Sequence, residues 1–216
     1  MPFIPLIAIA LVLLLDALPW YTSKKRRRKE TASRVWTRVL IFVALIAIVW
    51  WGLFMPWVNK DWVTDIQTVN PEGQAGKALI AYYPGRSDFQ QDIGKAFAEG
   101  MAANGWRVDM TAAGSGAPTN VSDYDLVVLG SPTYFFQPAG RITKYVKTLN
   151  LAGKDVVVIT SGLFSTTGSA NALQQAARTA GGNPIRAVEV KTGSGMAGMT
   201  NPTDVAREAG AAIPLP

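Results

Sequence analysis

The chain of 216 residues contains neither cysteine nor histidine. Without cysteine there are no disulfides and no thiolate nucleophiles, and without histidine there is no imidazole base for a catalytic triad. The usual ligand sets for zinc, haem and iron–sulfur clusters are excluded for the same reason. We therefore expect any chemistry of this chain to come from a bound cofactor.

The C-terminal part of the chain also lacks an excess of positive charge. Residues 1–60 carry nine Lys and Arg against two acidic residues, whereas residues 61–216 carry twelve basic and thirteen acidic residues. The formal net charge of +6 thus originates in the N-terminal segment. Because a nucleic-acid-binding domain needs positive charge to neutralise phosphates, we expect no nucleic-acid partner.

Two apolar runs dominate the N-terminal segment. They cover about residues 3–20, interrupted by Asp16, and residues 39–58, and the second has the length that spans a bilayer. We predict a transmembrane helical hairpin over residues 1–58, with the lipid bilayer as a partner and a basic loop at residues 21–38. The rival interpretation of the first run is a cleavable signal peptide, but the basic cluster follows this run instead of preceding it.

The basic loop also predicts the orientation of the hairpin. By the positive-inside rule the loop lies in the cytoplasm, and both ends of the chain lie on the opposite side. We therefore expect an integral membrane protein, of a prokaryotic plasma membrane, with its C-terminal domain on the non-cytoplasmic side. Residues 59–76, which contain Pro71, Gly73 and Gly76, are expected to form a linker.

Short apolar runs alternate with helix-like stretches along residues 77–216. The predicted strands are 78–82, 106–111, 126–129, 156–160 and 185–190. Between them apolar residues recur at helical spacing, as at Phe89, Ile93, Phe97 and Met101. Asn201 and Pro202 predict the start of the last helix. The alternation predicts an α/β fold with a five-stranded, parallel, doubly wound sheet.

Two loops after predicted strands carry candidate binding residues. The third strand runs into Gly130, Ser131, Pro132, Thr133, Tyr134 and Phe135. A glycine allows a sharp turn, a proline stiffens the loop, and the aromatic faces can stack on a flat ligand. The alternative is that these aromatic side chains fold into the core. The loop after the fourth strand offers hydroxyl groups and backbone donors, or is simply an exposed polar loop.

Five strands with intervening helices, and this loop after the third strand, resemble the flavodoxin family of flavin mononucleotide (FMN) proteins over about residues 77–212. The resemblance implies that FMN binds at the carboxyl ends of the strands, with its ring stacked on Tyr134 or Phe135. It implies no catalytic side chain and no metal. The cofactor-binding residues that it implies are Arg86, Ser87, Ser131, Pro132, Thr133, Tyr134, Phe135, Ser161, Gly162 and Thr166.

The stretch after the first strand departs from the family's phosphate loop, in which Ser and Thr hydroxyls and backbone amides surround the phosphate. Here Pro84 removes a donor and Asp88 adds negative charge, while Arg86 and Ser87 offer other means of binding a phosphate. Two functions follow. The first is a membrane-anchored FMN protein, an electron carrier or flavin-dependent oxidoreductase that exchanges electrons with a membrane partner. The second is a cofactor-free accessory or scaffold subunit of a membrane complex.

A third function, a reductase with a nicotinamide donor, lacks a second glycine-rich dinucleotide loop. The stretch 193–198 is glycine-rich, but alone it indicates only a flexible connection.

Overall fold

The computed structural model describes residues 32–54, 60–85, 87–192 and 200–216. The chain divides into two compact units, Met1–Trp57 and Val58–Pro216. The first predicted span, residues 21–31 of the basic loop, Arg86 and the glycine-rich stretch 193–198 lie outside the described residues.

The described part of the N-terminal unit is helical. It consists of α2 (Ala32–Val49) and the short π-helix η1 (Trp50–Phe54). Apolar side chains are exposed all around α2, and Leu40 and Ile48 are 67% and 65% exposed. None of the helices in the described part of the chain combines the length and the hydropathy needed to cross a bilayer. The hairpin therefore stays a prediction.

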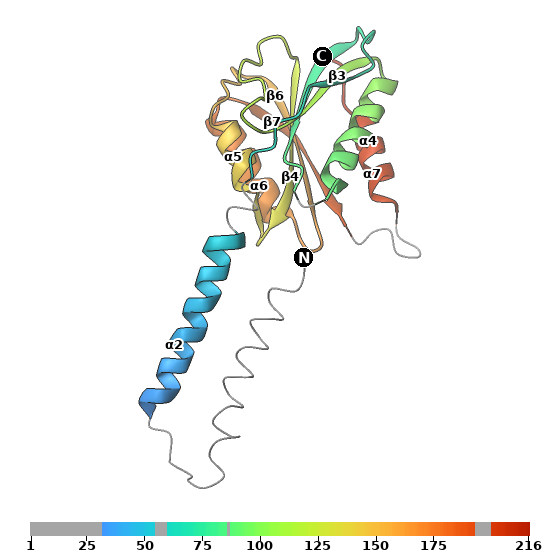
Figure 1. The fold of residues 1–216 in the computed structure, drawn as a ribbon. Helices are drawn as coiled ribbons and strands as arrows, with labels where there is room; N and C mark the ends of the chain where they lie inside the picture. Colours follow the sequence, from blue (N-terminus) through green and yellow to red (C-terminus); the bar gives the residue numbers. More distant parts are fainter. Residues whose placement is uncertain (1–31, 55–59, 86, 193–199) are drawn as a thin grey trace. The chain divides into compact units, whose positions relative to one another are not determined.

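The C-terminal unit consists of a sheet between two layers of helices (Figure 1). Five strands pair in parallel in the order β3-β2-β4-β6-β7. Their bounds are β2 (Gly76–Tyr82), β3 (Trp106–Ala112), β4 (Leu126–Tyr134), β6 (Asp155–Gly162) and β7 (Asn183–Lys191). This arrangement confirms the predicted five parallel strands with crossover helices on both faces.

The helices cover the two faces of the sheet in pairs. One face carries α4 (Phe89–Ala103) and α7 (Pro202–Ala211), and the other carries α5 (Gly140–Val146) and α6 (Thr167–Thr179) (Figure 1). Each pair buries its own hydrophobic cluster against the sheet. The predicted apolar face of the first crossover helix is confirmed, because Ile93, Phe97 and Met101 are fully buried in α4. Asn201 caps α7 as predicted, and its side-chain oxygen accepts from the Thr203 amide at 3.1 Å.

The sheet as a whole is mixed, which corrects the prediction of a wholly parallel sheet. Strand β1 (Gln67–Val69) pairs antiparallel with β3, and β5 (Gln137–Pro138) pairs antiparallel with β4. Because β1 falls in the predicted linker 59–76, this linker contributes to the sheet. The reason is a buried carboxylate on β3: Asp109 accepts from Thr68 Oγ1 on β1 at 2.7 Å and from the Tyr124 hydroxyl at 3.1 Å. A buried charge needs such partners.

Close backbone contact joins α4 to α7. A Cβ atom at Gly100 would lie 2.0 Å from the Arg207 carbonyl oxygen, and one at Gly210 would lie 2.1 Å from the Phe97 carbonyl oxygen. The two helices can therefore approach this closely only because these positions lack side chains.

Candidate functional site at the carboxyl edge of the sheet

The loops that follow β2, β3, β4 and β6 gather at one edge of the sheet, where the parallel strands end. Two of these loops end in exposed apolar side chains, which together we call the apolar tips. Their exposed fractions are 67% for Phe135, 62% for Phe136, 66% for Leu163 and 73% for Phe164. Large apolar side chains exposed together on a soluble domain indicate a binding surface.

The loop that carries Phe135 and Phe136 is a hairpin turn, not the loop from Gly130 onward that the sequence predicted. Strand β4 continues through Ser131 and Pro132, which pair with β6, and reverses only at Phe135–Phe136 into β5. Gly130 does not form a turn. It allows β4 to lie close to Tyr82 on β2, because a Cβ atom there would lie 2.9 Å from Tyr82 Cβ. The predicted stacking loop is therefore a rigid two-stranded projection.

The turn holds two bulky residues in a left-handed backbone conformation. The φ angles are +50° at Phe135 and +63° at Phe136. Two-residue hairpin turns with positive φ favour Asn and Gly, and an aromatic residue in this region costs about 1–2 kcal/mol. The first turn of α6 packs against this hairpin, because a Cβ atom at Gly168 would lie 2.8 Å from the Phe136 carbonyl oxygen. Backbone strain of this kind clusters at functional sites.

The predicted hydroxyl ligands Ser131 and Ser161 are buried and bonded within the protein. Ser131 Oγ donates to the Pro132 carbonyl and accepts from the Ala139 amide, both at 2.9 Å. Ser161 Oγ donates to Gln90 Oε1 at 2.5 Å and so links β6 to α4. Both hydroxyls are therefore engaged in hydrogen bonds within the protein near the carboxyl ends of β4 and β6.

Thr166 is also bonded within the protein, at the start of α6. Its hydroxyl donates to Glu189 Oε2 on β7 at 2.8 Å. Gly162 lets this loop approach the hairpin, since a Cβ atom there would lie 3.3 Å from Thr133 Cβ. The structure thus brings the predicted residues of the two loops together.

Several buried polar atoms make no hydrogen bond within the described residues. They lie near the carboxyl ends of β4 and β6 and in the first turns of α4 and α6, on both faces of the sheet. These atoms are Thr133 Oγ1, Thr160 Oγ1, Gln90 Nε2 and Ser169 Oγ. A buried polar atom without a partner costs about 1–3 kcal/mol. Each of these atoms would therefore gain from a polar partner such as a water molecule.

The loop after β2 lies against the hairpin. A Cβ atom at Gly85, where φ is +76°, would lie 3.1 Å from Pro132 Cγ and from the Tyr134 hydroxyl. Ser87 and Asp88 are exposed, and Asp88 precedes α4 without a side-chain capping bond. The predicted phosphate ligand Ser87 therefore stays a prediction, and Arg86 lies outside the described residues.

Tyr134 is half-buried and packs against the hydrophobic cluster beneath α5 and α6. The exposed aromatic faces belong to Phe135, Phe136 and Phe164. Phe136, Leu163 and Phe164 were missed as candidates from the sequence. For Leu163 and Phe164 the available signal was an apolar pair inside an otherwise polar loop.

The chain enters the C-terminal unit along this same edge. Asp61 forms an ion pair with Arg141 at the start of α5 and accepts from the Ser115 amide at 3.0 Å. The Ala112 amide, at the carboxyl end of β3, donates to Thr64 Oγ1 at 2.9 Å. The hydrogen bond from Arg141 keeps the pKa of Asp61 below its usual value. These contacts fasten the entry segment Asp61–Thr64 to the carboxyl edge.

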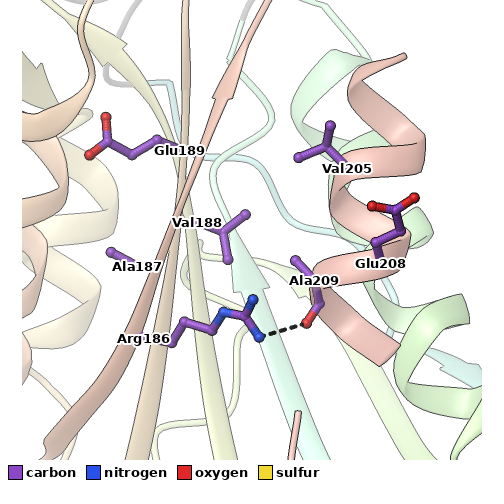
Figure 2. A pocket seen from close by; sticks show the side chains of 7 residues that line it. All are labelled: Arg186, Ala187, Val188, Glu189, Val205, Glu208 and Ala209. Atoms are coloured by element: carbon purple, nitrogen blue, oxygen red, sulfur yellow. Dashed lines mark hydrogen bonds between the residues drawn. The ribbon is translucent and has the colours of Figure 1, made fainter. Parts of the chain in front are cut away.

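A depression of about 490 Å³ lies elsewhere, between β7 and α7. Figure 2 shows Arg186 and Val188 pointing toward α7 and Glu189 pointing to the other face of the strand. Arg186 Nη1 donates to the Ala209 carbonyl at 3.3 Å and so binds the C-terminal end of α7. This depression lies beside the outer strand β7, and Arg186 is already hydrogen-bonded to α7.

No family model and no curated protein matches the sequence. Solved structures match the fold. A flavodoxin from the domain Archaea superposes with a TM-score of 0.52 at 16% identity, over 62% of this chain and 94% of that chain. Two-electron reduced flavodoxin of Megasphaera elsdenii gives a TM-score of 0.51 at 18% identity, over 62% and 98%. Oxidised flavodoxin 2 of Bacillus cereus gives 0.52 at 18% identity, over 62% and 94%.

The C-terminal unit has the flavodoxin fold. The strand order agrees with this finding, since flavodoxins place their first strand between the second and the third. In this fold the ligand-binding crevice lies outside the carboxyl ends of the strands, at the edge that carries the apolar tips. At identities below one fifth the likeness concerns the fold alone.

Proposed function

We propose that this chain is a membrane-anchored flavodoxin-fold protein that binds a flavin at the carboxyl edge and exchanges electrons with a membrane partner. The observation that carries the proposal is the exposure of the apolar tips on two adjoining loops at the carboxyl ends of β4 and β6. A flavin has an apolar, flat ring, and exposed aromatic side chains are complementary to it. Flavodoxins of the same fold have been captured in oxidised and two-electron reduced forms.

Different groups of the two loops contact different parts of the flavin in this proposal. Phe136 and Phe164, on the two apolar tips, offer aromatic faces that stack on the ring and exclude water. The backbone of the two loops offers hydrogen-bonding groups for the polar edge. A bound flavin supplies the electron-transfer chemistry, and the protein tunes it through stacking and hydrogen bonding. No acidic or basic side chain is required.

The phosphate of FMN contributes little to this binding. An exposed carboxylate about 4 Å from a phosphate costs about 1 kcal/mol per unit charge in water and about 4 kcal/mol at an effective dielectric of 20. Asp88 is exposed, so the lower value applies. We therefore expect riboflavin to bind within about tenfold of FMN, which corresponds to about 1.4 kcal/mol.

A cofactor-free accessory subunit is the second candidate function. It is favoured by the packing of Gly85 against the hairpin and by Asp88 at the start of α4, since both disfavour a phosphate. The two functions differ in one observable property, the binding of flavin.

The membrane anchor is part of the proposal. Its support is the exposure of the large apolar side chains of α2 between Val39 and Ile48 and the clustering of basic residues before the helix in the sequence. The charge of the loop favours a domain on the non-cytoplasmic side of a plasma membrane. A reporter fused after Pro216 that is active only in the cytoplasm would contradict this orientation.

The decisive experiment is the visible absorption spectrum of the full chain in detergent, titrated with FMN and with riboflavin. The variants Phe136→Ser and Phe164→Ser each remove one stacking face, and we expect each to weaken binding about tenfold. Ile185→Ser is the matched control, because Ile185 is exposed at the amino end of β7 and should leave binding unchanged. If neither flavin binds, the cofactor-free function replaces the first.

A further inference from the structure

The four apolar tip residues lie on two loops that pack against each other. The contacts of Gly162 with Thr133, and of Gly168 with Phe136, bring the loop after β6 against the hairpin after β4. On these adjoining loops Phe135, Phe136, Leu163 and Phe164 are each more than 60% exposed. Exposed apolar side chains of this kind can insert into the apolar layer of a bilayer interface.

The segment by which the chain enters the domain is bonded to the carboxyl edge. Asp61 and Thr64 are fastened there by their bonds to Arg141, Ser115 and Ala112. In the sequence, Asp61 follows closely on Phe54 at the end of η1, so the domain and the proposed anchor are joined by a short connection.

Lys60, just before the entry segment, and Trp62 within it are side chains typical of a bilayer interface. Lys60 Nζ lies 4.0 Å from the centre of the Trp62 ring, and Trp62 is half-buried against the domain. Tryptophan and lysine are the residues that anchor proteins at the level of the lipid headgroups. A lysine at this position is suited to attract anionic lipid.

We propose that the carboxyl edge docks on the surface of the bilayer that holds the chain's own helix, with the apolar tips inserted into the interfacial layer. This inference rests on the proposed membrane anchor. The bilayer is favoured over a second protein because a covalent connection to the proposed anchor raises the effective concentration of bilayer for the domain. Insertion of the tips also gives a reason for two phenylalanines at a turn where Asn and Gly would be less strained.

Spin labelling tests the docking directly, because the chain has no native cysteine. Single-cysteine variants Phe136→Cys and Phe164→Cys of the full chain are labelled with a nitroxide. They are reconstituted, free of flavin, in vesicles of phosphatidylcholine and phosphatidylglycerol. Collision with oxygen, which partitions into lipid, is compared with collision with a water-soluble nickel complex. Asp123→Cys, exposed before the amino end of β4, is the aqueous control, and Val43→Cys reports on α2.

Docking predicts a severalfold higher ratio of oxygen to nickel collisions at the tip positions 136 and 164 than at position 123. A lipid-like ratio at position 43 with water-like ratios at both tips would overturn the docking and leave the anchor intact. Water-like ratios at all four positions would overturn both. This result is separate from flavin binding, since docking requires the tip ratio to be high in the flavin-free protein that is measured.

Discussion

The strained hairpin turn gives a quantitative prediction about stability. In the double variant Phe135→Asn, Phe136→Gly, the turn receives the residues that tolerate its positive φ angles of +50° and +63°. Relief of the strain contributes about 2–4 kcal/mol for the two residues. Against this gain stand the loss of the buried third of each side chain, about 1–2 kcal/mol in total, and the added backbone entropy of glycine, about 0.5–1 kcal/mol. The balance is a stabilisation of about 1 kcal/mol.

For a domain of this size, 1 kcal/mol raises the melting temperature by about 2–4 °C. The measurement is thermal and urea unfolding of the full chain in detergent, followed by near-ultraviolet circular dichroism. The matched control is Leu163→Ser, Phe164→Ser, which removes similar exposed apolar surface from a loop without positive φ angles and should not stabilise. If the hairpin variant is less stable than the parent by 1 kcal/mol or more, the account of strain at this turn is wrong. The same variant should bind flavin more weakly, which is the expected trade between stability and function.

Three further predictions concern the frame around the site. Ser161→Ala leaves the buried side-chain oxygen of Gln90, Oε1, without its hydrogen bond and should lower the free energy of unfolding by about 1–3 kcal/mol, measured with urea. Gly100→Ala forces α4 away from α7 and should cost about 2–3 kcal/mol in the same assay. Asp61 has a lowered pKa beside Arg141, so its pair stabilises the fold above the ordinary pKa and is lost as the pH falls through the lowered value. Asp61→Asn should therefore flatten the acid limb of the stability profile, by less than about 1 kcal/mol because the pair is exposed.

Each of these predictions has its own control. Combining Ser161→Ala with Gln90→Leu removes both polar partners and should recover much of the loss, and a fully stable single variant would contradict the role of the bond. Gly94→Ala on the same helix meets the end of the Met110 side chain at 3.3 Å and Ile80 Cγ2 at 3.9 Å, and should be neutral or stabilising. Equal losses at positions 94 and 100 would refute the argument from close packing. An unchanged acid limb in Asp61→Asn would show that the pair does not fasten the entry segment.

The centres of the five parallel strands could be predicted because each is an apolar run with clear breaks on either side. The end of β4 could not, because Gly130 and Pro132 are strong turn signals in isolation. In the structure the pairing of Pro132 with Ser161 on β6 overrides them. Strand β1 was not predicted for a related reason: it has three residues, and its position depends on a hydrogen bond between Thr68 and Asp109, 41 residues apart.

The candidate site was predictable as a region but not in its detail. The strands' carboxyl edge follows from the alternation of strands and helices, and the structure brings the predicted loops together there. Which hydroxyls are available does not follow, since Ser161 is occupied by Gln90, 71 residues away. Exposure is equally non-local: Tyr134 and Phe135 are neighbours in the sequence, yet one packs on the core and the other protrudes.

The short strand β1 has a consequence for how the domain can be isolated. It covers the outer side of β3, which would otherwise present a free row of backbone donors and acceptors to any other strand. A fragment that starts at Lys77, where the first long strand suggests a boundary, would uncover this row and remove the Thr68 hydroxyl from the Asp109 carboxylate. Such a fragment should self-associate through β3, whereas one that starts at Lys60 keeps the row covered and should remain monomeric.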